Sequence, residues 1–207
     1  MARATSEAVR RRRRRPEEAE AEILAAADQL LRERPFHEVT VGAIMERTTL
    51  SRKSFYVYFR DRFDLLTRLA RPLRERLDAA NAIWLEDEED PPAAGRVALL
   101  RVAQILSEDG VLVRELADAA RYDPKAERLW RSFNEPVIAS VAAKIRSEIK
   151  AGRATPVEPE ATARALVGMN LYSFFDQLIG RPDPDIDAIV DALHGVWIRV
   201  LYPAATT

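Results

Sequence analysis

The segment from residue 40 to residue 66, TVGAIMERTTLSRKSFYVYFRDRFDLL, constrains the fold more than any other part of the chain. Thr40 can cap a helix over 41–47, and Ser51 can cap a second helix that runs to about Tyr58. The second helix begins with hydroxyls and cations and ends with aromatic rings. Its first turn can therefore probe a DNA groove while its far end is packed in a core. The segment predicts a helix-turn-helix unit.

The distribution of charge favours nucleic acid as a partner of this region. Net charge is −1, but residues 1–76 carry 18 Lys and Arg against 12 Asp and Glu, and the remainder carries 14 against 21. We expect the polar segment over 1–15 to be disordered without a partner. It contains six consecutive arginines, Arg10, Arg11, Arg12, Arg13, Arg14 and Arg15. Such an arm can lie in a minor groove, although import signals, RNA-binding tails and solubilising ends share this composition.

The rest of the chain has the periodicity of helices. Apolar residues recur at helical spacing, and no alternating stretch is long enough for a sheet. We expect further helices over 16–34, 62–85, 94–107, 111–121, 124–151, 159–179 and 186–201, with an acidic loop over 86–93. Pro72 should kink its helix, and Pro136 should bend or split its own. The predicted fold class is all-α with about nine helices: a basic arm over 1–15, a DNA-binding domain over 16–62, and a larger helical domain over 63–207.

Composition argues against several classes of function. The chain has no cysteine, so disulfides, thiolate zinc sites and cysteine nucleophiles are excluded. Its two histidines, His37 and His194, lie in different halves with no carboxylate pair or phosphate loop beside them. We therefore expect no enzyme, no metal and no cofactor. No run of about 18 apolar residues predicts a membrane span, and no apolar segment follows the arginines, so we expect a cytoplasmic protein.

Within the helix-turn-helix unit the pattern separates buried from exposed side chains. The expected core residues are Val41, Ile44, Met45, Leu50, Phe55, Tyr58 and Phe59. Arg52 and Lys53 are left exposed and can pair with guanine edges or phosphate. The hydroxyls of Thr40, Ser51 and Tyr56 can bond phosphate oxygens, and Ser54 is expected to be exposed on the same face and able to donate. Backbone N–H groups near Val41, at the start of the first helix, can bind a further phosphate.

The block over 23–66 resembles the DNA-binding domain of the TetR family of transcriptional repressors. The matching residues are Thr40-Val41, Ile44, Leu50-Ser51, Phe55-Tyr56-Val57-Tyr58-Phe59 and Arg62 to Leu66. The resemblance implies DNA-contacting roles for Tyr56 and for residues near Thr40, Tyr58 and Arg62.

Three residues depart from the family pattern. Thr48 and Thr49 stand where the family typically has alanine and glycine, which predicts a looser or differently shaped turn, because threonine resists positive φ. Lys53 replaces a residue that is commonly small, which adds a cation to the DNA face.

The rear half contains a candidate ligand site. Asn170 lies on an otherwise apolar stripe, so it is either a core residue bonded to a backbone carbonyl or a polar anchor for an apolar ligand. Segments 126–133, 166–170 and 194–197 resemble those of the ethionamide-resistance repressor branch of the family. The resemblance implies a mostly apolar tunnel in which Asn170 bonds a ligand carbonyl. The other expected lining residues are Leu100, Gln104, Trp130, Phe133, Val137, Phe174 and Trp197.

The last two helices are more apolar than one buried face requires. In the TetR family they pair with their copies as a dimer interface, and the resemblance implies the same here. The expected interface residues are Leu171, Phe175, Leu178, Ile189, Leu193 and Val200. The leading hypothesis is a homodimeric repressor released from a palindromic operator by a small apolar effector. The alternatives are an activator, a ligand-independent DNA-binding protein whose pocket is only core, ordinary internal packing of the last helices, and a protein-interaction module.

Overall fold

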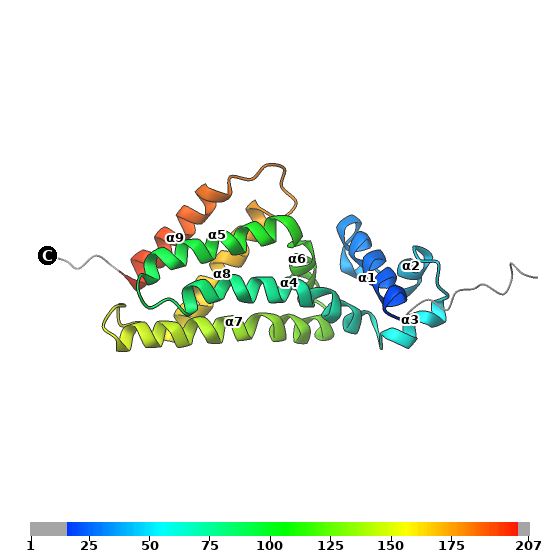
Figure 1. Cartoon of the computed structure of the whole chain (residues 1–207), viewed down its shortest axis with the longest axis horizontal. Helices are drawn as coiled ribbons and strands as arrows, with labels where there is room; N and C mark the ends of the chain where they lie inside the picture. Colours follow the sequence, from blue (N-terminus) through cyan, green and yellow to red (C-terminus); the bar gives the residue numbers. More distant parts are fainter. Residues whose placement is uncertain (1–15, 203–207) are drawn as a thin grey trace, which may run out of the picture. The chain divides into compact units, whose positions relative to one another are not determined.

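The structure, a computed structural model, describes residues 16–202, and over that range every regular element is a helix (Figure 1). The elements are α1 (Pro16–Glu33), η1 (Phe36–Glu38), α2 (Val41–Glu46), α3 (Arg52–Tyr58), α4 (Arg62–Leu85), α5 (Pro91–Asp109), α6 (Val111–Ala119), α7 (Pro124–Lys150), α8 (Pro159–Gln177) and α9 (Ile186–Leu201). For residues 16–202, the prediction of an all-helical fold with about nine helices is confirmed. The arginine run over 10–15 lies outside the described residues.

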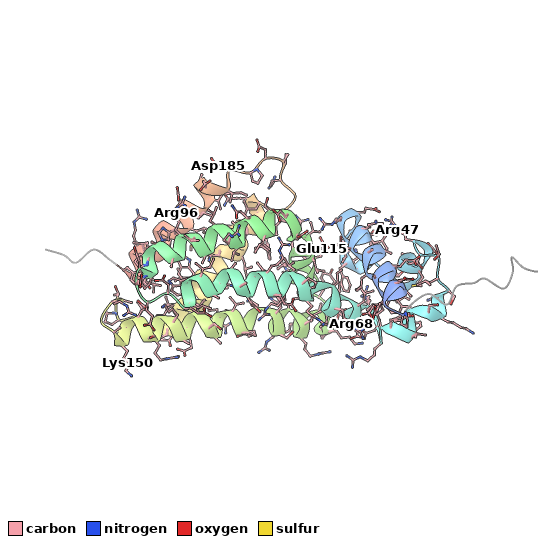
Figure 2. The ribbon with its side chains drawn as sticks, viewed as in Figure 1. Arg47, Arg68, Arg96, Glu115, Lys150 and Asp185 are labelled. Atoms are coloured by element: carbon pink, nitrogen blue, oxygen red, sulfur yellow. The ribbon has the colours of Figure 1, made fainter. Side chains whose placement is uncertain are left out.

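The chain divides into two compact units, and the division at Leu69 falls inside α4. The sequence placed this boundary between residues 62 and 63, directly after the first residue of the helix. The first turns of α4 belong to the N-terminal unit because Leu65 and Leu66 are buried there. Arg68 also joins α4 to α1, with its Nη1 2.8 Å from Glu20 Oε1 (Figure 2).

The N-terminal unit packs α1, α2, α3 and the start of α4 around one apolar core. Its fully buried side chains include Ile23, Leu30, Ile44, Phe55 and Phe59. The predicted cap of α2 is confirmed, because the Thr40 hydroxyl accepts the N–H of Ala43 at 3.1 Å. Ser51 occupies the cap position of α3, but its hydroxyl makes no capping bond and lies 3.0 Å from the hydroxyl of Ser54.

The C-terminal unit contains the rest of α4 and the helices α5 to α9. Helix α5 begins at Pro91, so the expected start at residue 94 was wrong and the acidic loop ends earlier. Asp90 caps this helix by accepting the N–H of Ala93 at 3.1 Å. A proline is well suited to the first turn of a helix, where its missing N–H would have no partner.

Neither internal proline divides its helix. Pro72 lies inside α4, and Pro136 lies inside α7, which continues unbroken to Lys150. Of the two outcomes expected at Pro136, a bend or a split, the split does not occur. No helix among residues 16–202 combines the length and the apolar character needed to cross a bilayer.

A buried ion network joins the end of α7 to the loop after α4. The Glu148 carboxylate accepts bonds from Arg153 at 2.7 and 2.9 Å and lies 3.2 Å from the Lys144 ammonium. The bonds from Arg153 and Lys144 hold the pKa of Glu148 below its usual value. Lys144 also donates to the Asp87 carbonyl, so the network fixes the loop that leads into α5.

Candidate nucleic-acid interface and cavity

The surface of α3 carries the side chains expected to meet DNA. Arg52, Lys53 and Tyr56 are exposed, while Phe55 is fully buried. Phe59, at the end of the helix, packs 5.4 Å from the Phe55 ring. The helix therefore has an anchored end and a free, cationic first turn, as the sequence indicated.

Two aromatic and apolar positions of α3 differ from the sequence analysis. Tyr58 is half-buried, and the ring that contacts Phe55 edge-on is Tyr56, at 5.3 Å. Val57, which the sequence analysis did not single out as a contact, is 75% exposed. The helical period gives the signal that was missed: Val57 lies four residues after Lys53, on the same face.

The turn between α2 and α3 is held by hydrogen bonds, which argues against the looser of the two forms expected for it and leaves a different shape as the other expectation. The Thr48 hydroxyl donates to the Met45 carbonyl at 2.9 Å and accepts the N–H of Leu50 at 3.2 Å. The N–H and hydroxyl of Thr49 both donate to Glu22 Oε1, at 2.6 and 2.9 Å. Neither threonine has positive φ. Side-chain bonds and a carboxylate of α1 thus hold this turn without a glycine.

Arg62 is placed to organise the unit internally. Its Nη1 lies 3.3 Å from the Phe36 carbonyl and 3.4 Å from the Val39 carbonyl, and its guanidinium stacks 4.4 Å from the centre of the Phe36 ring. It fastens the start of α4 to the segment that leads into Thr40. The backbone N–H groups near Val41 were expected to bind a phosphate. One of these donors, the N–H of Ala43, already donates to the Thr40 hydroxyl.

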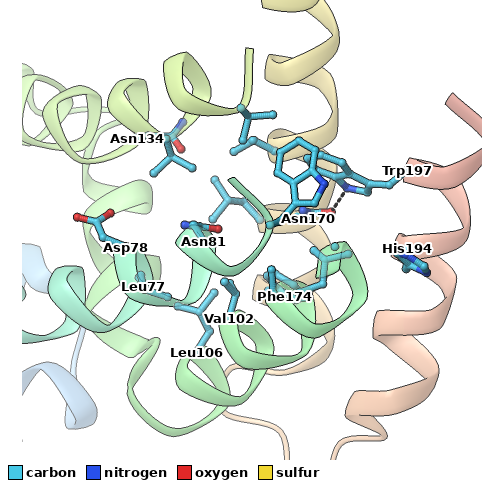
Figure 3. Close-up of a pocket in the computed structure, with 18 of the residues that line it drawn as sticks. Leu77, Asp78, Asn81, Val102, Leu106, Asn134, Asn170, Phe174, His194 and Trp197 are labelled. Atoms are coloured by element: carbon cyan, nitrogen blue, oxygen red, sulfur yellow. Dashed lines mark hydrogen bonds between the residues drawn. The ribbon is translucent and has the colours of Figure 1, made fainter. Parts of the chain in front are cut away.

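A cavity lies within the C-terminal unit and encloses about 990 Å³, including the part open to solvent (Figure 3). Six of the eight expected lining residues surround it: Trp130, Phe133, Val137, Asn170, Phe174 and Trp197. Leu100 and Gln104 do not line it. Helix α5 faces the cavity with Gly95, Ala98, Leu99, Val102 and Leu106. These positions share one helical face, and residues 100 and 104 lie on the opposite side of the helix.

One hydrogen bond determines which groups Asn170 presents to the cavity. Trp197 Nε1 donates to Asn170 Oδ1 at 3.1 Å (Figure 3). An indole N–H can only donate, so the amide oxygen must face it. The amide nitrogen of Asn170 is left to donate to a ligand acceptor. The sequence left open that Asn170 is a core residue whose side chain bonds a backbone carbonyl. Among residues 16–202 its side chain bonds the Trp197 indole instead.

Further polar residues of the cavity were not found from the sequence. They are Arg74, Asp78 and Asn81 on α4, Asn134 on α7 and His194 on α9. His194 Nε2 lies 2.8 Å from the Pro92 carbonyl and must therefore carry the proton. On α4 the three polar residues lie between the residues of the apolar stripe. Their spacing is also that of an ordinary solvent-exposed helix face, so the sequence alone could not identify them as lining a cavity.

The last two helices present a different surface from the one expected. Leu178 is fully buried and Leu193 is 5% exposed, both in the unit's own core, so placing them in an intermolecular interface was wrong. Leu171, Phe175, Ile189 and Val200 are half-buried. The exposed face instead carries Ala165, Gly168 and Tyr172 on α8, and Ala192 and Val196 on α9.

These features define a helix-turn-helix DNA-binding regulator with a separate helical domain that contains a cavity. Residues 23–69 match the family model of bacterial regulatory proteins of the tetR family, and residues 96–203 match the model of the C-terminal domain of the transcriptional regulator EthR. The chain belongs to the TetR family of transcriptional regulators, with a C-terminal domain of the EthR type. Among residues 16–202, no group of three or more metal-ligating side chains is gathered.

One curated relative agrees with this assignment, and two solved structures share the fold. The HTH-type transcriptional regulator EthR of Mycolicibacterium smegmatis is 29% identical over 202 residues, which cover 93% of this chain and 91% of the relative. NalD of Pseudomonas aeruginosa, described as a secondary repressor of the MexAB-OprM multidrug efflux pump, has 20% identity and a TM-score of 0.74, covering 92% and 98% of the two chains. SmeT, solved in complex with triclosan, has 16% identity and a TM-score of 0.71, covering 92% and 94%.

Proposed function

We propose that this chain is a homodimeric transcriptional repressor that binds a palindromic operator and leaves it when a small, largely apolar ligand fills the cavity. The observation that carries the proposal is the exposed cationic face of α3 on a rigidly packed helix-turn-helix unit. NalD is described as a repressor and SmeT was solved with triclosan, which supports both halves of the proposal.

The DNA contacts divide into positioning and reading. The hydroxyls of Thr40, Ser51 and Tyr56 bind phosphate oxygens and set the register of the unit on the duplex. Arg52 and Lys53 read guanine edges in the major groove or neutralise phosphate. The basic arm adds sequence-independent, salt-sensitive affinity from an adjacent groove.

Two copies of the chain associate through the exposed face of α8 and α9. Ala165, Gly168 and Ala192 are small and exposed, so backbones can approach closely, and Tyr172 and Val196 supply apolar area. A two-fold contact brings the same patch of each copy together. The two helix-turn-helix units related by that axis require a palindromic site. Its half-sites should lie about 34–36 Å apart, or a multiple of that distance.

Helix α4 connects ligand and DNA binding. Its first turns pack in the N-terminal unit, and its later residues Leu77, Asp78 and Asn81 line the cavity. A ligand that favours one position of this helix shifts the population away from the DNA-binding arrangement. The coupling is reciprocal, so operator DNA must weaken the ligand by the same factor.

Selection of bound fragments from random duplex DNA tests the proposal, followed by titration of the recovered site with and without apolar ligands. We expect a palindromic site whose affinity falls when a ligand binds. Recovery of an asymmetric site contradicts the dimer. A ligand that raises the melting temperature but leaves operator affinity unchanged supports the ligand-independent alternative.

A further inference from the structure

The cavity has a second polar end, which the proposed release mechanism leaves unused. Figure 3 shows Asp78 and Asn81 on α4 and Asn134 on α7, whereas Trp197 and His194 lie on α9. We call Arg74, Asp78, Asn81 and Asn134 the rim.

The rim residues come from two helices that lie side by side in the same direction. Arg74 Nη1 donates to the Phe133 carbonyl at 2.6 Å, and thirteen residues later the Asp87 carbonyl accepts from Lys144. These two contacts align α4 with α7 along the cavity. Asn134 therefore lies near the turn of α4 that carries Arg74 and Asp78, and Asn81 lies about one turn further along.

The charges of the rim cancel each other. Arg74 Nε lies 2.8 Å from both carboxylate oxygens of Asp78, and the same guanidinium lies 5.1 Å from the centre of the Phe133 ring. A cationic ligand would compete with Arg74 for Asp78, and an anionic ligand would compete with Asp78 for Arg74. Neither gains a free countercharge, so the rim favours an uncharged group.

The two amides of the rim are available to a ligand. Asn81 and Asn134 make no hydrogen bond to any of residues 16–202, and both are half-buried on the cavity lining. Each carries donors and an acceptor. A purely apolar molecule that covered them would remove their water without replacing its hydrogen bonds, at a cost of about 1–3 kcal/mol for each unpaired group.

We propose that the ligand is an uncharged, elongated molecule with a polar group at each end. A hydrogen-bond acceptor binds the amide nitrogen of Asn170, an apolar middle packs among Leu77, Val102 and Leu106, and a hydroxyl or amide binds Asn81 and Asn134. This inference rests on the proposed ligand function of the cavity and adds the chemical class of the ligand.

A matched set of methyl ketones tests the inference by calorimetric titration of the full-length protein. The probes are decan-2-one, 10-hydroxydecan-2-one, 9-oxodecanoate and 10-aminodecan-2-one, together with their eight- and twelve-carbon homologues. All share one carbonyl and differ only in the far end. At the best length we expect the alcohol to bind about 5-fold more tightly than the ketone, since a net hydrogen bond contributes about 1 kcal/mol. The carboxylate and the ammonium should bind more weakly than the alcohol.

Two variants distinguish the ends of the cavity. In the double variant Asn81→Leu/Asn134→Leu, the ratio of alcohol to ketone affinity should fall to within about 2-fold, while the ketone still binds. In Asn170→Leu, both affinities should fall by the same factor and the ratio should persist. The melting temperature without ligand shows that each variant is folded, and retained ketone binding adds a second check for the double variant.

The outcomes separate this inference from the proposed function. If the ketone binds but the alcohol gains nothing, or if the gain survives in Asn81→Leu/Asn134→Leu, the two-ended ligand is wrong and the ligand cavity stands. Preferential binding of a charged probe also overturns it. If no probe of any length binds, both the cavity's ligand function and this inference fall.

Discussion

Val57 is the residue of α3 whose exposure has no structural explanation within the chain. Its side chain is 75% exposed on the same helical face as Lys53. An apolar side chain in the major groove meets one apolar group on the base edges, the 5-methyl of thymine. We expect Val57 to select thymine at one position of each half-site.

Replacing single thymines of the selected operator by deoxyuridine tests this role. At one position per half-site the loss of the methyl should weaken binding about 4-fold, as expected for about 0.8 kcal/mol. Val57→Ala should weaken binding to the thymine operator by a similar factor and should be insensitive to the deoxyuridine change. Val97→Ala, which removes an exposed valine from α5, is the control. Additive losses in the double change would contradict direct contact.

Tyr202 lines the cavity, and its buried hydroxyl makes no hydrogen bond of ordinary geometry to residues 16–202, although the Trp84 side chain lies close enough to oppose part of the rise in its pKa. Burial raises the pKa of Tyr202 to about 12, from 10.0 in the unfolded chain. The folded-state pKa of Tyr202 is higher than its unfolded-state pKa. The protonated hydroxyl therefore makes its full contribution to the free energy of unfolding below pH 10, and this contribution is lost as the pH rises to about 12.

Tyr202→Phe should therefore unfold differently in alkali. Near pH 8 we expect it to be as stable as the unmodified chain, or more stable by about 1 kcal/mol, since an unsatisfied group is removed. Between pH 10 and 12 it should lose less stability in urea titrations than the unmodified chain. Tyr122→Phe, which removes an exposed hydroxyl, serves as the control. Parallel pH profiles for Tyr202→Phe and the unmodified chain would refute this account.

Among the elements, those with local signals were predictable and those that depend on packing were not. Helices α2 and α3 were predicted to within about one residue, because their caps and aromatic ends are local. The start of α5 was missed because Pro91 was interpreted as a breaker, although it follows a capping aspartate. The lining face of α5 and the rim of the cavity depend on how each helix is rotated in the unit, and no single helix encodes that rotation.

The turn before α3 illustrates a contact that local sequence cannot show. Glu22 holds Thr49 from 27 residues away in the chain. Glu22→Ala should free the turn and weaken operator binding about 5-fold, if the lost bonds contribute about 1 kcal/mol. Glu18→Ala removes the same charge from an exposed position of α1 and should bind as the unmodified chain does. Equal losses in both variants, measured by DNA titration, would show that only charge matters.

At the scale of the whole molecule, the fold class and the class of transcriptional regulator followed from the sequence, whereas the exposed face of the last two helices did not. Helices α8 and α9 are apolar on more than one face, and the pattern could not distinguish the face buried in the unit from the face left exposed. Leu178 belongs to the first and Tyr172 to the second.

Gly168→Arg tests the exposed face as the dimer contact. A Cβ at Gly168 meets no atom within 4 Å, so the single chain accommodates a side chain there. We expect a folded monomer by sedimentation equilibrium, with weakened operator binding. Ala139→Arg places the same charge on an exposed position of α7 and should remain dimeric. A dimeric Gly168→Arg protein would place the interface elsewhere.

The most direct test of the account is the affinity and selectivity of Arg52→Ala/Lys53→Ala for the selected operator. Loss of two base or phosphate contacts at about 1–3 kcal/mol each should lower specific affinity on the order of 100-fold and bring it close to non-specific binding. Arg121→Ala/Arg128→Ala removes two exposed cations from the C-terminal unit and should leave selectivity unchanged. If the folded α3 variant still selected the same duplex with affinity within about 2-fold of the unmodified chain, α3 would not be the DNA-reading helix.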